Sequence, residues 1–199
     1  MKKFKVAVTG NIGSGKSSFC KFLEEMNYNV TKADEIAKDL MANDPKIKSE
    51  LMKHFGARSF TQDGLDKTYL SDKVFSDKSN LEKLNALVHP AVIKKVKRIM
   101  NDQLKNSNIV FHEAALIYEA KMESLFQYVV LISCDQKIRM ERKRQFAGIS
   151  EEEFLRRESN QIPEDEKKKC ADFIFTNNGS PNELKAKAEL LIKILNGMM

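Results

Sequence analysis

Residues 10–17 constrain this chain more than any other segment. They read Gly-Asn-Ile-Gly-Ser-Gly-Lys-Ser and match G-x-x-x-x-G-K-[ST], the pattern of a phosphate-binding P-loop. Residues 4–9 before the loop are apolar and β-branched, as in a buried strand, and a helical pattern begins at Ser17. In that context backbone N–H groups surround phosphate oxygens at a helix N-terminus. We therefore predict a nucleoside-triphosphate site rather than a glycine-rich turn that only links a strand to a helix.

The P-loop pattern assigns chemistry to individual side chains. Lys16 is expected to reach the β- and γ-phosphates of ATP, and the Ser17 hydroxyl is expected to bind Mg²⁺. The residues predicted to contact the nucleotide are Asn11, Ile12, Gly13, Ser14, Gly15, Lys16, Ser17 and Ser18.

The composition indicates one folding unit with no membrane segment. The chain has 199 residues, enough for one substantial core. No apolar run approaches the roughly 18 residues of a membrane helix, so we expect a cytoplasmic protein without a membrane partner. The three cysteines have neither a zinc-binding nor a disulfide-framework spacing. A net charge of +6 suits polyphosphate ligands and is also compatible with nucleic acid, although we expect a monomer that does not bind nucleic acid.

Apolar strand patterns alternate with helical patterns along the chain. A second strand is expected to end near Asp34, and further strands are predicted at 108–112, 128–133 and 172–175, with helices at 35–40, 45–55, 70–75 and 181–195. Pro90 is expected to divide the helical pattern of 80–104 into two helices. The alternation predicts an α/β, doubly wound, mainly parallel sheet with right-handed crossovers. We assign 1–34, 106–136 and 170–199 to the core, 35–105 to a helical insertion and 137–169 to a lid.

Three carboxylates are candidates for catalysis or metal binding. Asp34 at the end of the second strand suits a general base near the phosphate loop, and it equally suits an N-cap of the following helix. Glu113 follows the third strand, where P-loop enzymes often place a metal-linked acid, and Glu119 lies six residues beyond. Either glutamate is also compatible with plain solvation.

A basic run follows the most apolar predicted strand. Arginines on a mobile lid can stabilise the charge that develops on a transferring phosphoryl group, whereas the same run also fits a solvated helix face. We favour the lid. His89, before a proline, has the alternative of a structural hydrogen-bonding role. The basic run comprises Lys137, Arg139, Arg142, Lys143 and Arg144.

Motifs along nearly the whole chain, taken together, resemble the dephospho-CoA kinase family. The loop pattern alone would not separate this family from other P-loop proteins, but the order of the remaining motifs is specific to it. The motifs are Val8-Thr9-Gly10 through Ser17, Lys32-Ala33-Asp34, Phe55-Gly56, Asp63-Gly64, Leu84-Asn85-Ala86-Leu87-Val88-His89-Pro90, Gln161-Ile162-Pro163 and Ala171-Asp172 through Asn177-Asn178-Gly179.

This resemblance implies an activity and a set of roles. The activity is transfer of the γ-phosphoryl group of ATP to the ribose 3′-hydroxyl of dephospho-CoA, the last step of coenzyme A synthesis. The resemblance also implies that 35–105 is a CoA-binding lobe in a P-loop NTPase three-layer fold. The roles it implies are Asp34 as catalytic carboxylate, Lys16 and Ser17 as ATP and Mg²⁺ ligands, Arg144 as the second lid arginine, Asn177 in the turn that borders the adenine, and His89, Glu119 and Lys67 as substrate contacts. From helix register near Met140, we expect Arg139 or Arg142 to act as a helper of Arg144 after a local adjustment of register.

The chain departs from the family pattern at several positions. Asn11 replaces a glycine, which asparagine tolerates better than most residues because it visits left-handed backbone angles. Lys32 stands where the family often has an aspartate, Ala115 replaces a proline, and Met140 takes the place of the first lid arginine. Since Arg144 lies four residues after Met140, both share one helix face, which favours Arg144 as the catalytic cation.

Other functions share parts of this pattern. A nucleoside or nucleotide monophosphate kinase would use the same fold, lid and metal with a smaller acceptor. A nucleotide-dependent switch is disfavoured because the chain has neither an Asn-Lys-x-Asp nor an Asp-x-x-Gly signature. A nucleic-acid-binding ATPase is a third alternative, although aromatic residues do not alternate with the basic ones.

Overall fold

The computed structural model describes residues 2–75 and 77–199. Within that part of the chain, one compact unit joins the segment ending at Lys32 to Ile99–Met199, and the second compact unit is Ala33–Arg98.

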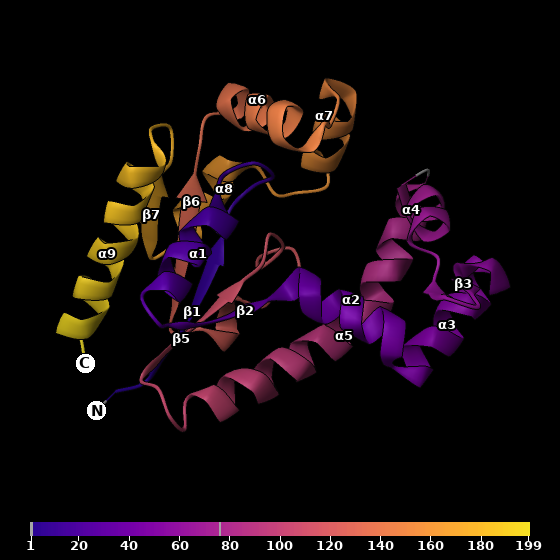
Figure 1. The fold of residues 1–199 in the computed structure, drawn as a ribbon, viewed down its shortest axis with the longest axis horizontal. Coiled ribbons are helices and arrows are strands. Elements are labelled where there is room, and N and C mark those ends of the chain that lie inside the picture. Colours follow the sequence, from indigo (N-terminus) through magenta and orange to yellow (C-terminus); the bar gives the residue numbers. More distant parts are fainter. Residues whose placement is uncertain (1, 76) are drawn as a thin grey trace. The chain divides into compact units, whose positions relative to one another are not determined.

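The first unit is built on a five-stranded sheet in the order β2-β5-β1-β6-β7, in which every pairing is parallel (Figure 1). The predicted α/β class and five-stranded, mainly parallel sheet are thereby confirmed. The register places Glu113 beside both Val8 and Lys32, so β1, β2 and β5 end together. The strands are β1 (Phe4–Thr9), β2 (Asn29–Lys32), β5 (Ile109–Glu113), β6 (Tyr128–Ser133) and β7 (Phe173–Thr176).

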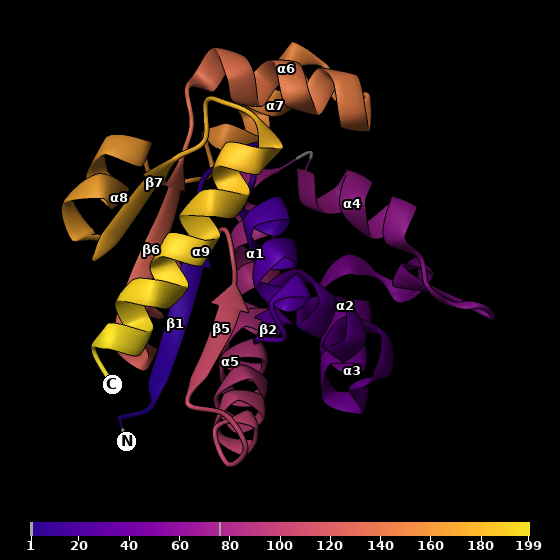
Figure 2. The same cartoon turned by 60° about the vertical axis from the view of Figure 1, so that its left-hand side comes forward.

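One face of the sheet is covered by α1 (Lys16–Glu25) and α9 (Pro181–Gly197), which lie side by side (Figure 2). Phe19 and Leu23 of α1 and Leu191 of α9 are completely buried with the inward residues of β1, β5 and β6. Burial of such side chains stabilises the fold by about 1.5–3 kcal/mol each. A capping box at Ser180 and Glu183, followed by Pro181, fixes the start of α9.

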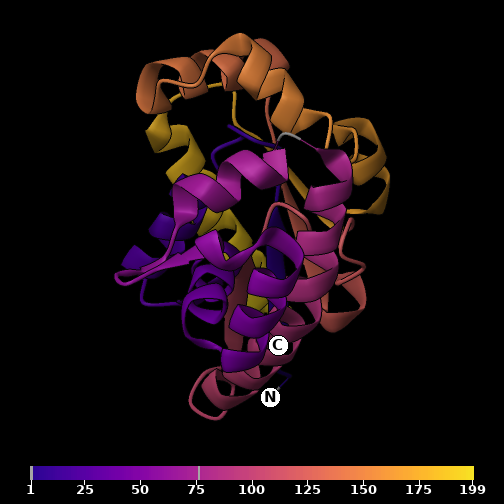
Figure 3. The ribbon, with the colours of Figure 1, turned by 90° about the vertical axis from the view of Figure 1, so that its right-hand side faces the viewer.

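The segment between β6 and β7 contains three helices. These are α6 (Gln136–Ala147), α7 (Glu151–Glu158) and α8 (Glu164–Cys170). Helices α6 and α7 lie side by side (Figure 3), while α8 contacts β6. A short 3-10 helix, Glu123–Leu125, precedes β6.

The second unit is mainly helical. Asp44 caps α3 by accepting hydrogen bonds from the N–H groups of Lys46 and Ile47, and Pro45 occupies the first helical position. Its elements are α2 (Ala33–Asn43), α3 (Pro45–Phe55), the 3-10 helix Ala57–Ser59, β3 (Phe60–Thr61), β4 (Gly64–Leu65), α4 (Lys67–Phe75) and most of α5 (Lys78–Gln103).

Three local predictions need correction. The prediction that two helices meet at Pro90 is wrong, because α5 continues through it. Its ribbon changes direction along its length (Figure 1), and the buried side chains of Val88, Val92 and Val96, spaced four residues apart, hold one face inward. The two-residue strands β3 and β4 pair antiparallel where no element was predicted. Strand β2 ends at Lys32, not near Asp34, because α2 begins at Ala33.

No helix in the described part of the chain combines the length and apolarity needed to cross a membrane. All three cysteines are free, with Cys20 and Cys134 buried and Cys170 exposed.

Candidate active site

The P-loop connects the end of β1 at Thr9 to the start of α1 at Lys16. Gly15 is the N-cap residue of α1 with φ 94°, in the left-handed region, and no side chain caps the first turn of the helix. The first N–H groups of a helix have no partner within the helix and carry its positive dipole end. The start of α1 is therefore suited to bind an anion such as the phosphates of ATP.

Two loop glycines are required by close contacts as well as by their backbone angles. A Cβ atom on Gly13 (φ 79°) would lie 2.6 Å from the Arg139 carbonyl oxygen. A Cβ atom on Gly15 would lie 2.1 Å from the Asn177 amide nitrogen. Any other residue at either position would push a neighbouring element away from the loop.

The remaining loop residues vary in exposure. Asn11 and Ser14 are buried, whereas Ile12 and Lys16 are half-buried, and Ser17 and Ser18 are exposed at the start of α1. Ser14 donates its N–H to the Asn11 carbonyl oxygen at 3.0 Å, which closes the loop on itself.

Ser17 and Glu113 form a pair of oxygen ligands at the base of the loop. The Ser17 hydroxyl donates to Glu113 Oε1 at 2.5 Å, and Glu113 is 8% exposed at the end of β5. A hydroxyl and a carboxylate side by side are oxygen donors of the kind that Mg²⁺ prefers. These residues fit the metal predicted for Ser17, and they add Glu113, which had been only one of three candidate carboxylates.

Asn177 connects the P-loop to the turn after β7. Its Nδ2 donates to the Ser14 carbonyl oxygen at 2.8 Å, and its backbone N–H donates to the Ser133 carbonyl oxygen at 2.7 Å. The side chain is almost completely buried. Asn177 thus supports the loop directly, whereas its predicted contact with adenine stays a prediction.

Arg139 lies on α6 against the loop and is only 4% exposed. Its Nη1 donates to the Ile12 carbonyl oxygen at 3.1 Å, and its Nε donates to the Cys134 carbonyl oxygen at 2.8 Å. Its Nη2 forms an ion pair with Glu158 of α7. All three guanidinium nitrogens are engaged, so in this arrangement Arg139 joins the loop to α6 and α7.

The two other arginines of the basic run lie in different settings. Arg142 Nη1 donates to the Asn177 carbonyl oxygen at 2.9 Å, beside the turn that holds the loop. The Arg144 side chain is 71% exposed and pairs with Glu141 at 2.9 Å. Exposure leaves the Arg144 guanidinium able to move, as a lid cation must, but its catalytic role is not tested by these contacts.

The remaining predicted residues, except Glu119, lie in the second unit. Asp34 occupies the first turn of α2 with an exposed side chain and, among the described residues, makes no capping hydrogen bond. The N-cap interpretation is therefore not supported. Lys67 begins α4 and is exposed, and His89 is half-buried within α5, where burial lowers its pKa.

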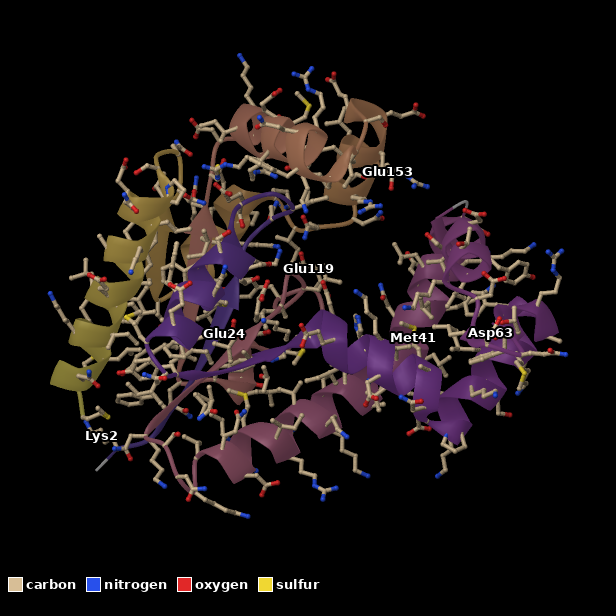
Figure 4. The ribbon with its side chains drawn as sticks, in the orientation of Figure 1. Lys2, Glu24, Met41, Asp63, Glu119 and Glu153 are labelled. Atoms are coloured by element: carbon tan, nitrogen blue, oxygen red, sulfur yellow. The ribbon has the colours of Figure 1, made fainter. Side chains whose placement is uncertain are left out.

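Glu119 lies in the segment between β5 and β6, where Figure 4 labels it. Its Oε1 accepts hydrogen bonds from the Ile162 N–H at 2.8 Å and forms an ion pair with Lys167 Nζ at 2.9 Å. Lys32 pairs with Glu24 at 2.9 Å.

Sequence reasoning missed four residues around the loop: Gln161, Lys167, Glu158 and Glu164. Glu164 accepts from the Ser133 hydroxyl at 2.6 Å and so fixes α8 at the end of β6. Gln161 belonged to a motif of the family resemblance, a signal that could have directed attention to it. The charged run that contains the other three gave no sign of which side chains are buried.

The sheet order, the P-loop and the helices that hold it define a P-loop nucleotide-binding fold of the α/β class. The shikimate kinase of Acinetobacter baumannii shares this fold, with a TM-score of 0.57 at 12% identity over 98% of this chain and 94% of that chain. The dephospho-CoA kinase family model matches residues 4–183. This chain therefore belongs to the dephospho-CoA kinase family.

Individual members of the family agree with this assignment. The dephospho-CoA kinase of Corynebacterium glutamicum is 30% identical over 190 residues, covering 94% of this chain and 95% of that protein. The structure of the dephospho-CoA kinase from Campylobacter jejuni superposes with a TM-score of 0.74 at 25% identity, covering 98% of both chains.

Proposed function

We propose that this chain transfers the γ-phosphoryl group of ATP to the ribose 3′-hydroxyl of dephospho-CoA, giving coenzyme A and ADP. The observation that carries the proposal is the family match across residues 4–183. The strand–P-loop–helix geometry, with its uncapped helix start, supplies the matching phosphate site.

The P-loop and its neighbours account for the nucleotide half of the reaction. The N–H groups of Gly13 and of residues 15–18, together with the Lys16 ammonium, bind the phosphate oxygens of ATP, and they are in place before the charge of the transition state develops. Ser17 and Glu113 would hold Mg²⁺, which would supply neutralisation of phosphate charge. The short Ser17–Glu113 hydrogen bond supports this assignment because it already places the two ligands together.

The acceptor half of the reaction is assigned to residues of 33–98. Asp34 accepts the proton of the attacking 3′-hydroxyl, a role supported by its exposed carboxylate and by the absence of a capping hydrogen bond among the described residues. Lys67 and His89 contact dephospho-CoA, and the lobe at 35–105 binds its pantetheine arm. Arg144, on the lid at 137–169, stabilises phosphoryl charge as the lid closes.

The test is an ADP-release assay across candidate acceptors. We expect dephospho-CoA to give a kcat/KM far above those of adenosine, nucleoside monophosphates and pantothenate. A nucleoside monophosphate as the best acceptor would identify a nucleotide kinase instead. ATP hydrolysis that no acceptor stimulates would refute the proposal.

Cytoplasmic location, a monomeric state and the absence of a nucleic-acid partner remain part of the proposal. Light scattering of the purified protein tests the monomer, and salt-dependent retention on immobilised RNA or DNA tests the last of these.

A further inference from the structure

Two consecutive residues outside the P-loop contact two consecutive residues within it. Gln161 Oε1 accepts a hydrogen bond from the Ile12 N–H at 2.8 Å. Asn11 Nδ2 donates to the Ile162 carbonyl oxygen at 3.3 Å, and Asn11 is 2% exposed. We call Gln161 and Ile162 the 161–162 clamp.

Both the N–H and the carbonyl oxygen of Ile12 form hydrogen bonds with side chains from outside the loop. Gln161 satisfies the Ile12 N–H, and Arg139 Nη1 satisfies the Ile12 carbonyl oxygen at 3.1 Å. Both partners come from the segment between β6 and β7, where Gln161 lies 149 positions and Arg139 lies 127 positions along the chain from Ile12. The position of the loop backbone at Ile12 therefore depends on side chains that the loop does not itself contain.

The carboxylate of Glu119 holds the clamp and is itself paired with a buried lysine. Glu119 Oε1 accepts from the Ile162 N–H at 2.8 Å and lies 2.9 Å from Lys167 Nζ. Lys167, which also donates to the Ala115 carbonyl oxygen at 3.2 Å, has a completely buried side chain. A buried ammonium is costly unless it is paired and hydrogen-bonded, so Lys167 fixes where the Glu119 carboxylate lies.

We propose that the 161–162 clamp positions the P-loop for nucleotide binding and that the side chain at position 119, by accepting the hydrogen bond from the Ile162 N–H, is the support that holds the clamp. Phosphate binding needs the loop N–H groups in place beforehand, and small displacements of such groups weaken binding. Glu119 acts through Ile162 in this account, so it is a positioning residue and not a contact to the acceptor. The kinetic part of the test rests on the proposed function, whereas nucleotide binding can be measured without it.

The first test removes the clamp hydrogen bond alone. Gln161→Ala is compared with Gln127→Ala, because Gln127 Oε1 accepts from the Lys5 N–H, also at 2.8 Å, near the start of β1, whereas the loop follows the other end of that strand. We expect Gln161→Ala to raise the Kd for ATP and for ADP about three- to tenfold, the effect of one net hydrogen bond. The KM for dephospho-CoA and the unfolding midpoint should match those of Gln127→Ala. Equal nucleotide affinity in the two variants would overturn the proposal.

The second test separates the hydrogen bond to Ile162 from the ion pair. The double variants Glu119→Gln with Lys167→Met and Glu119→Ala with Lys167→Met both remove the buried charges, so neither leaves one charge unpaired. Only the glutamine can still accept from the Ile162 N–H. We expect the glutamine variant to bind ATP within about twofold of wild type and the alanine variant about three- to tenfold more weakly. Equal ATP affinity in the two, with a raised KM for dephospho-CoA in the alanine variant, would instead make Glu119 an acceptor contact.

Discussion

At the scale of single residues, Asp34 and Lys16 have different proposed roles: Asp34 accepts the proton of the acceptor hydroxyl, and Lys16 binds the phosphates of ATP. Asp34→Asn keeps the size of the side chain but removes its basicity, so we expect kcat to fall roughly 10²-fold or more while ATP affinity is retained. Lys16→Ala should weaken ATP binding as well as turnover, because it removes the cation beside the phosphates. Steady-state kinetics and calorimetric titration with ATP check both. Nearly full kcat in Asp34→Asn would remove Asp34 from its role as general base.

His112 makes the stability of the fold depend on pH. It is completely buried, its Nδ1 lies 2.8 Å from the Thr31 hydroxyl, its ring stacks on Phe126, and burial lowers its pKa from 6.5 to about 4. Between these values the unfolded chain binds the proton and the folded chain does not, so stability falls as the pH drops below about 6.5 and the loss levels off below about 4.

Between pH 7 and pH 5 this single group should cost about 2 kcal/mol of unfolding free energy. Urea unfolding of wild type and His112→Asn at both pH values measures it, since the asparagine does not titrate. The wild type should lose about 2 kcal/mol more than the variant. An identical pH dependence in the two proteins would show that His112 titrates normally in the folded state.

The sequence predicted the positions of some charged site residues but not which charged side chains are buried. The sequence pattern located Lys16, Ser17 and the acid at Glu113 because each has a fixed place relative to a strand end. It could not show that Arg139 and Lys167 are buried, because within a run such as Lys167-Lys168-Lys169 every residue resembles a solvated one. Their burial depends on partners far along the chain, Ile12 for Arg139 and Glu119 for Lys167.

At the scale of elements, two of the three arginines of α6, Arg139 and Arg144, have different expected roles. Arg139→Ala would leave Glu158 unpaired at a site where the two side chains are 5% and 16% exposed, so we expect a loss of about 3 kcal/mol of unfolding free energy. Arg144→Ala removes only an exposed pair and should change stability by less than about 0.5 kcal/mol.

The variants Arg139→Ala and Arg144→Ala distinguish a residue that stabilises the fold from one that acts in phosphoryl transfer. If Arg144 is the lid cation, Arg144→Ala should lower kcat about 10²–10³-fold at unchanged stability, with a smaller effect on ADP binding measured without acceptor. Arg142→Ala should cost less. Denaturant unfolding and kcat are measured on each variant. A near-wild-type kcat in Arg144→Ala would mean that its pair with Glu141 is an ordinary surface contact.

Elements with a long apolar pattern were predictable, and short ones were not. Strand β6 and the start of α9 occur where a continuous apolar run and Pro181 placed them. The strands β3 and β4 have two residues each, too few to show any period. Pro90 illustrates the converse, because the local rule that proline ends a helix is outweighed by burial on both sides of it.

At the scale of the whole molecule, the family match and the P-loop lead to one claim about the substrate. Residues 4–183 match the dephospho-CoA kinase model, and the parallel sheet places the loop, Ser17 and Glu113 at the ends of neighbouring strands. Membership of the family identifies the ribose 3′-hydroxyl as the phosphoryl acceptor. Analogues of dephospho-CoA that each lack one ribose hydroxyl test this assignment.

The most direct measurement compares ADP release with dephospho-CoA and with its 2′-deoxy and 3′-deoxy analogues. We predict turnover of dephospho-CoA and of the 2′-deoxy analogue, and only the acceptor-free background rate with the 3′-deoxy analogue. Turnover of the 3′-deoxy analogue at the rate of dephospho-CoA would contradict the assignment of the 3′-hydroxyl as the phosphoryl acceptor.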